Sequence, residues 1–145
     1  MQKSLRVLQM PGFDVRQDGD VIRIAIPSDQ LFQPGSAQLR NGAHQLIDTV
    51  GTAVARSYPR QIISVEAYTD SGPVGGGYAS RHQLTANQAM AVLDQLTRQN
   101  RLSDRQLFMV AQGANHPRAS NATSAGQAQN RRVELVVYPE TIDGR

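Results

Sequence analysis

Apolar and polar residues alternate along residues 13–16, near the start of the chain, and a second short stretch, residues 21–26, is also typical of a strand. In the second stretch the isoleucines all fall on one face, which is the period-2 pattern of a half-buried strand. The Asp18-Gly19 dipeptide between the stretches is typical of a tight hairpin turn. The sequence therefore predicts a β-hairpin. It follows an N-terminal extension, residues 1–12, where we expect a short strand or helix stub.

A helical period of apolar residues then occurs twice. Residues 41–57 carry apolar side chains at positions i, i+1, i+4 and i+8, and Pro59 stops this pattern. Residues 84–100 carry a second stripe, formed by Leu84, Val92 and Leu96. Each stripe predicts an amphipathic helix with one buried face.

Three further segments are rich in apolar and β-branched residues and are predicted to be strands: 61–68, 107–111 and 131–138. A short helix is expected near residues 124–129. Because strands and helices alternate, the fold class is α/β (α+β), a mixed sheet with the two main helices on one face. One domain covers residues 13–139, and residues 140–145 are expected to be a frayed tail.

Composition narrows the classes of protein. The 145 residues are 39% hydrophobic and include no Cys, so neither a disulfide framework nor a Cys-based metal site can form. The net charge of +3 is mild and spread out, which argues against a nucleic-acid partner. No apolar run approaches the roughly 20 residues of a membrane span. The N-terminus lacks the apolar core of a signal peptide, so the chain is either cytoplasmic or a domain of a longer exported protein.

The stretch between the second predicted helix and the strand before it is the most informative part of the chain. It begins with Thr69-Asp70 at a strand end and continues through a loop with four glycines. Polar groups at the end of a strand and the start of a helix converge on one place, where small ligands bind. The Asp70 carboxylate either accepts hydrogen bonds from a cationic ligand or bonds its own backbone in a turn, and the turn is the commoner case.

Gln88 falls on the apolar stripe of the second helix, where a polar side chain needs a partner. One interpretation is a capping box, with Thr85 as N-cap and Gln88 reaching back from the third position. The other is that Gln88 lines a ligand pocket beside Asp70. Both interpretations place the start of this helix near Leu84.

Signals for catalysis and for metal binding are weak. The three His residues are scattered without metal-ligand spacing, and no G-x-S-x-G elbow, P-loop or dinucleotide fingerprint occurs. A hydrolase would need a nucleophile or a carboxylate pair that the sequence does not offer. Asn130-Arg131-Arg132 precedes the last strand, where Arg132 is expected to pair with an acidic neighbour at a solvated edge.

Four stretches, in this order, resemble the C-terminal peptidoglycan-binding domain of the OmpA/MotB family. Residues 29–39 are similar to L-F-x-x-G-S-A-x-L, 68–70 to G-H-T-D, 84–89 to L-S-x-x-R-A, and 121–134 to N-x-T-x-x-G-R-x-x-N-R-R-V-E. Together they cover about residues 20–138, and their order makes the resemblance far more specific than any single motif.

The resemblance implies a β/α sandwich that binds the peptide stem of peptidoglycan without catalysis, cofactor or metal. In the family, an Asp at the position of Asp70 and an Arg at the position of Gln88 hold the amino and carboxylate groups of diaminopimelate. Gln cannot make the bidentate charged pair of an Arg, a loss on the order of 1.5–3 kcal/mol, and Arg81 is the candidate substitute. The candidate ligand-binding residues are Asp70, Gln88, Thr69, Arg81, Leu84, Thr85, Phe32, Asn130 and Arg132.

Two functions follow from the resemblance. In the first, the chain is a periplasmic module that anchors a larger envelope protein to peptidoglycan, and any membrane attachment is made by segments outside this chain. In the second, the domain has lost the ligand Arg and acts as a protein-interaction or dimerisation module, so that a homodimer is one expected partner.

Overall fold

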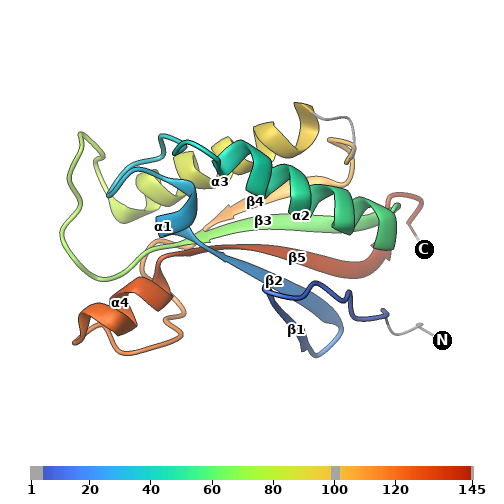
Figure 1. Cartoon of the computed structure of the whole chain (residues 1–145), viewed down its shortest axis with the longest axis horizontal. Helices are drawn as coiled ribbons and strands as arrows, with labels where there is room; N and C mark the ends of the chain where they lie inside the picture. The colour runs from blue at the N-terminus through green and yellow to red at the C-terminus, as the bar shows by residue number, and fades with distance from the viewer. Residues whose placement is uncertain (1–4, 99–101, 145) are drawn as a thin grey trace.

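The structure is a computed structural model that describes residues 5–98 and 102–144. Within them, a five-stranded sheet has the strand order β1-β2-β5-β3-β4, and helices α2 and α3 lie together over one of its faces (Figure 1). The strands are β1 (Asp14–Asp18), β2 (Val21–Pro27), β3 (Gln61–Tyr68), β4 (Leu107–Ala111) and β5 (Arg132–Thr141). The helices are α1 (Ser28–Leu31), α2 (Ala43–Ser57), α3 (Arg81–Arg98) and α4 (Ser124–Asn130). The predicted fold class is thus confirmed.

The sheet is mixed, as predicted. Strands β1 and β2 form the expected hairpin, in which Asp18 pairs with Val21 across a turn where Gly19 has a φ of 60°. Glycine adopts this left-handed conformation without steric cost. Strand β5 pairs antiparallel with both β2 and β3, whereas β3 and β4 are parallel. The connection between these parallel strands is made through α3.

The core lies between the helices and the sheet. The isoleucines of β2 are buried on the helix-covered face, as their alternation predicts. Burying each such side chain stabilises the fold by roughly 1.5–3 kcal/mol. Helices α2 and α3 are in close contact at Gly51, where a Cβ atom would lie 2.8 Å from the Cδ2 atom of Leu96. The two helices therefore pack side by side over one core.

Helix α3 begins at Arg81, one turn earlier than predicted. The expected capping box of Thr85 and Gln88 is wrong because Thr85 lies inside the helix. Its hydroxyl donates to the backbone carbonyls of Arg81 and His82, at 3.0 and 3.2 Å. Residues 99 and 100, also predicted to be helical, lie outside the described residues.

The cap is instead supplied by the end of the Gly-rich loop. The Ser80 hydroxyl accepts the backbone N–H of Gln83 at 3.0 Å, and the Gln83 side-chain oxygen accepts the N–H of Ala79. Ser80 and Gln83 have the same S/T-x-x-E/Q spacing as the predicted pair, and each lies five residues earlier. The pattern was correct in kind but assigned to the wrong turn.

The two ends of the described chain both differ from the prediction. Strand β5 continues to Thr141, so the tail is not frayed at Glu140 and Thr141. Pro139 is accommodated because the pairing with β3 is irregular between Gln61 and Ile63, and a bulge tolerates a residue without an N–H. At the other end, residues 5–12 form neither a strand nor a helix, and the Tyr58 hydroxyl holds them by accepting from the N–H of Leu8 at 2.9 Å.

Candidate functional site

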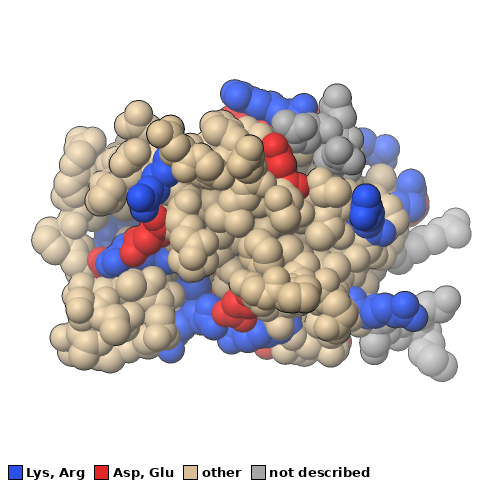
Figure 2. Space-filling model, in the orientation of Figure 1, with Lys and Arg blue, Asp and Glu red and all other residues tan. Residues whose placement is uncertain are grey.

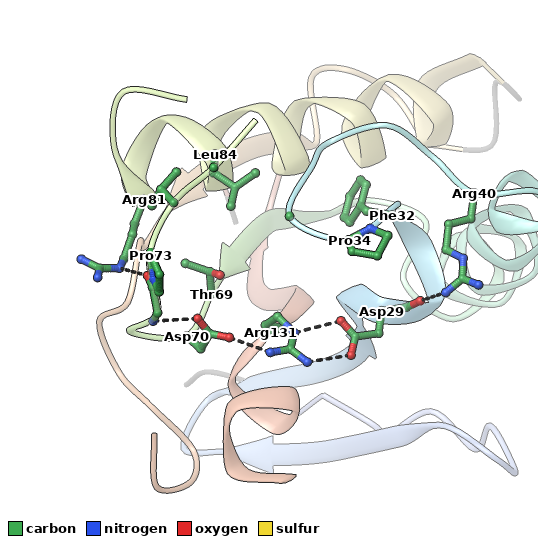
Figure 3. A pocket seen from close by; sticks show the side chains of 14 residues that line it. Asp29, Phe32, Pro34, Arg40, Thr69, Asp70, Pro73, Arg81, Leu84 and Arg131 are labelled. Carbon is green, nitrogen blue, oxygen red and sulfur yellow. Dashed lines mark hydrogen bonds and ion pairs between the residues drawn. The ribbon is translucent and has the colours of Figure 1, made fainter. Parts of the chain in front are cut away.

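A cleft of about 440 Å³ opens where β3 ends. Its walls come from segments far apart in the sequence: α1 and the turn after it, the end of β3, the Gly-rich loop, the first turn of α3, and the residue before β5 (Figure 3). Phe32 and Leu84 supply apolar surface, while the charged groups are Asp29, Arg40, Asp70, Arg81 and Arg131. Figure 2 shows basic and acidic side chains side by side in a hollow at the end of the molecule where α1 lies.

Asp70 lies in this cleft with Thr69 beside it. Its Oδ1 atom accepts the backbone N–H of Gly72 at 2.8 Å, and its Oδ2 atom accepts Nη1 of Arg131 at 2.6 Å. The turn-forming role that the sequence suggested is therefore present. These two hydrogen bonds do not use all of the acceptor capacity of Asp70, because a carboxylate offers about four lone-pair sites. A positioned anion with spare acceptor capacity faces the cleft.

Arg131 joins two carboxylates. Besides Asp70, its guanidinium donates from Nε and Nη2 to the two oxygens of Asp29, at 2.9 and 3.0 Å. The hydrogen bonds to Asp29, and then those to Asp70, outweigh the opposing effect of burial and raise the pKa of Arg131 above its ordinary value. The resulting Asp29–Arg131–Asp70 bridge fixes the floor of the cleft and leaves one net negative charge there.

Arg81 holds the Gly-rich loop in place. Its Nε and Nη2 atoms donate to the carbonyl oxygens of Gly72 and Ser71, at 3.1 and 2.6 Å. On the other side of the loop, the Tyr78 hydroxyl accepts the N–H of Ala37 at 2.9 Å. The loop thereby spans from α3 to the turn after α1 and forms one wall of the cleft.

Two predicted site residues, Thr85 and Gln88, do not line the cleft. Gln88 is only 5% exposed, and its Nε2 atom donates to the carbonyl of Ser36 at 3.0 Å. Its Oε1 atom is buried without a hydrogen-bond partner among the described residues. The Thr85 hydroxyl accepts the N–H of Gly113 at 3.1 Å and so joins α3 to the segment after β4.

Asn130 and Arg132 also lie outside the cleft. The Asn130 side chain accepts the N–H groups of Arg118 and Ala119, at 2.7 and 2.9 Å, and so holds the segment before α4. Arg132 donates from Nε to Glu134 at 2.7 Å, which confirms its predicted pairing with an acidic neighbour. Both side chains are buried rather than solvated.

The structure therefore brings together Phe32, Thr69, Asp70, Arg81 and Leu84, and it separates the other four candidates from them. Sequence reasoning missed Asp29, Arg40 and Arg131. Among the described residues, no cluster of His, Asp and Glu is arranged to hold a metal ion. Over the same residues, the helices include none with the length and apolarity that crossing a bilayer requires.

The sequence and the fold match a known family. The family model described as OmpA family matches residues 31–131, and the chain belongs to that family. Membership confirms the predicted resemblance and a non-catalytic domain rather than an enzyme.

The regions that match individual relatives span most of this chain but only part of each relative. A probable lipoprotein, YiaD of Escherichia coli, is 33% identical over 128 residues, which are 88% of this chain and 56% of that protein. The peptidoglycan-binding protein ArfA of Mycobacterium bovis is 31% identical over 106 residues, 73% of this chain and 31% of that protein.

Two solved structures share the fold. The periplasmic domain of Helicobacter pylori MotB superposes with a TM-score of 0.80 at 25% identity, covering 88% of this chain and 82% of that one. The cell wall anchor of the type VI secretion system (T6SS) from Pseudomonas aeruginosa superposes with a TM-score of 0.78 at 26% identity, covering 87% of each chain.

Proposed function

We propose that this chain is a non-catalytic peptidoglycan-binding module that anchors a larger envelope protein to the cell wall in the periplasm. Family membership supports the proposal, as do the similarities to a peptidoglycan-binding protein and to a cell wall anchor. Because the chain spans 56% of YiaD and 31% of ArfA, the anchored partner would be the remainder of a longer protein.

The observation that carries the proposal is the position of Asp70. Its carboxylate is fixed in the cleft by Gly72 and Arg131, so it does not have to be ordered when a ligand binds. An ammonium group has three donors and no acceptor, which suits the remaining lone pairs of this carboxylate. Asp70 would therefore hold the amino group of a diaminopimelate side chain.

The ligand's carboxylate needs a cation, and Gln88 does not provide one. Arg81 lines the cleft at the first residue of α3, where the helix N-terminus adds a partial positive charge. Arg40 lines the same cleft, with one guanidinium nitrogen donating to the carbonyl of Asp29. These residues would replace the family Arg as partners of the ligand's carboxylate.

One observation favours the second candidate function, a degenerate domain that acts in protein interaction or dimerisation. The guanidinium of Arg131 already pairs with Asp70, and the side chain of Gln88 is turned to Ser36 instead of the cleft. In this alternative the charges of the cleft serve only to hold the loops together.

Co-sedimentation with purified diaminopimelate-type sacculi tests the proposal, comparing the wild-type chain with Asp70→Asn. The Asn side chain keeps an oxygen for the N–H of Gly72 but loses the charge. We expect binding to weaken by about tenfold or more. Asp143→Asn is the matched control, because Asp143 also pairs with an arginine, Arg60, which precedes β3 and so lies at the other end of that strand from Asp70.

The outcomes separate the two functions. Sedimentation of the wild type and of Asp143→Asn, but not of Asp70→Asn, supports peptidoglycan binding through the cleft. Equal sedimentation of all three places the binding surface elsewhere. No sedimentation of any of them favours the interaction module.

A further inference from the structure

The two edges of the sheet are built differently. Strand β1 forms one edge, and its sequence D-V-R-Q-D carries three charges. Strand β4 forms the other, and its sequence L-F-M-V-A carries no charge, proline or glycine. Natural proteins protect exposed edges with charges, prolines or bulges, because an unprotected edge pairs readily with another strand. Strand β4 lacks this protection.

The outer side of β4 presents free backbone groups. The N–H of Ile63 donates to Gln106 and the N–H of Gln112 donates to Ala67, at 2.8 and 3.0 Å. In a parallel ladder alternate residues bond the neighbouring strand, so the even-numbered residues of β4 bond β3. The N–H groups of Met109 and Ala111 point outward, and among the described residues no other strand pairs with them. The N–H of Leu107, at the start of the strand, donates to the carbonyl of Asp104 at 3.3 Å.

Apolar side chains flank this edge on both faces of the sheet. Among the described residues, the exposed large hydrophobic side chains are Phe108, 42% exposed, and Met90, 45% exposed. Phe108 belongs to β4 and rests against Tyr138, with ring centroids 5.9 Å apart. Met90 belongs to α3, the helix that packs against β4, and lies three residues before Leu93, which packs against the core.

We propose that β4 pairs antiparallel with β4 of a second copy of this chain, about a two-fold axis at Met109. In this register Leu107 faces Ala111 of the second copy and Met109 faces its counterpart, so the outward N–H groups of Met109 and Ala111 each meet a carbonyl of the second copy. Phe108 faces Val110, an aromatic–β-branched pair of the kind that stabilises sheets. The sheet would continue unbroken through both copies.

The second copy is favoured over an unrelated strand because the pattern of β4 is symmetric. Its outward-facing positions and its apolar side chains repeat about the central Met109, and the adjacent Arg105 would face uncharged Gly113. A two-fold interface uses the same surface twice and closes at two copies. The charged β1 edge opposes growth beyond the dimer. This proposal does not depend on ligand binding in the cleft.

Sedimentation velocity over a range of protein concentrations tests the dimer. The double variant Phe108→Lys, Val110→Lys places like charges opposite each other in the proposed register. We expect its dimer Kd to rise by about tenfold or more. Gln17→Lys adds a charge to the exposed β1 edge and should leave the dimer unchanged. A wild type that is monomeric at every concentration, or a dimer that survives the double variant, overturns the proposal.

Disulfide trapping tests the register without relying on charged variants. The native chain has no Cys, so an introduced thiol has no internal competitor. In the proposed register Phe108 lies opposite Val110 in a non-hydrogen-bonded pair with a Cα–Cα distance of about 4.5 Å, which a disulfide can span. A mixture of Phe108→Cys and Val110→Cys chains should cross-link faster than either variant alone. Equal rates in the mixture and in the single variants overturn the register.

Discussion

Arg131 determines how much negative charge the cleft presents to a ligand. It neutralises one of the two carboxylates that it joins, Asp29 and Asp70, and so the floor keeps a single negative charge at a fixed position. A ligand ammonium would compete with the guanidinium for Asp70 rather than meet a bare anion. The gain from such a contact is correspondingly modest, and the identity of residue 88 becomes important.

The Gln88→Arg substitution restores the cation of the family motif. Leu84 lies one helical turn earlier and lines the cleft, and Ser36, the partner of Gln88, follows the cleft residue Gly35. We expect the longer Arg side chain to keep the contact with Ser36 and to reach the cleft. Affinity for a diaminopimelate-containing fragment should then rise by roughly tenfold or more, as measured by calorimetric titration.

A matched control for this gain is Gln95→Arg, since Gln95 is equally buried in α3 but bonds Asp48 and His44 of α2. It introduces the same charge away from the cleft and should not improve affinity. Tight binding by the unmodified chain would show that Arg81 already suffices. The substitution should not cost α3 a helix cap, because the side chain of Gln88 bonds Ser36 and does not cap the helix.

Of the five candidate residues at the cleft, Thr69, Asp70, Arg81 and Leu84 could be placed there from the sequence, because a strand end and a helix start delimit it. Phe32 came from the resemblance to the family. Asp29 was missed because only tertiary pairing, such as the 3.0 Å bond from the N–H of Ser28 to the carbonyl of Arg131, brings α1 to this place. Arg131 did leave a signal. Alternation along the last strand puts it on the face of the core residue Val133, and its neighbour Arg132 on the other face.

At the scale of elements, periodicity located every strand and both long helices, and the errors lie at their ends. The start of α3 was misplaced because Ser80 and Thr85 both begin an S/T-x-x-Q pattern, and propensity alone does not choose between them. Burial makes the choice. Thr85 is buried against the segment after β4, so it cannot also stand at the exposed end of a helix.

The packing of helix α4 against the preceding segment requires a residue without a Cβ atom at position 126. A Cβ atom at Gly126 would lie 1.9 Å from the carbonyl oxygen of Ser120, a backbone atom that cannot move aside cheaply. Gly126→Ala should therefore lower the free energy of unfolding by about 1–3 kcal/mol, although alanine is the better helix former. Urea denaturation measures this. The exposed position Gln129→Ala is the control, and equal stability of the two variants would show that the contact with Ser120 relaxes.

For the whole molecule, the open face of the sheet is held by a buried charge network. Glu134, 1% exposed, accepts Nη1 of Arg23 and Nε of Arg132, at 2.9 and 2.7 Å. Glu66 accepts the hydroxyls of Ser64 and Tyr68, each at 2.7 Å. The network ties β2, β3 and β5 together without a covering layer of helices. Removing one member leaves its partner buried and unpaired, which is costly.

Tyr68 makes this network sensitive to alkaline pH. Burial, followed by the hydrogen bond to Glu66, raises the pKa of Tyr68 above its ordinary value of 10.0. In the unfolded chain the phenol ionises near pH 10, whereas in the folded chain it stays protonated. Above that pH the unfolded state binds fewer protons than the folded state, so stability falls as the pH rises.

Tyr68→Phe should show both consequences. At neutral pH it removes a donor to a buried carboxylate, and we expect a loss of about 1–3 kcal/mol in the free energy of unfolding. Above pH 10 it removes one titrating group, so the decline with pH should be shallower than in the wild type by up to roughly 1.4 kcal/mol per pH unit. Urea denaturation between pH 7 and about 11 measures both quantities, with Tyr138→Phe as a control for the loss of a hydroxyl outside the network. Parallel pH profiles for the wild type and Tyr68→Phe would show that Glu66 and burial do not hold the proton on Tyr68.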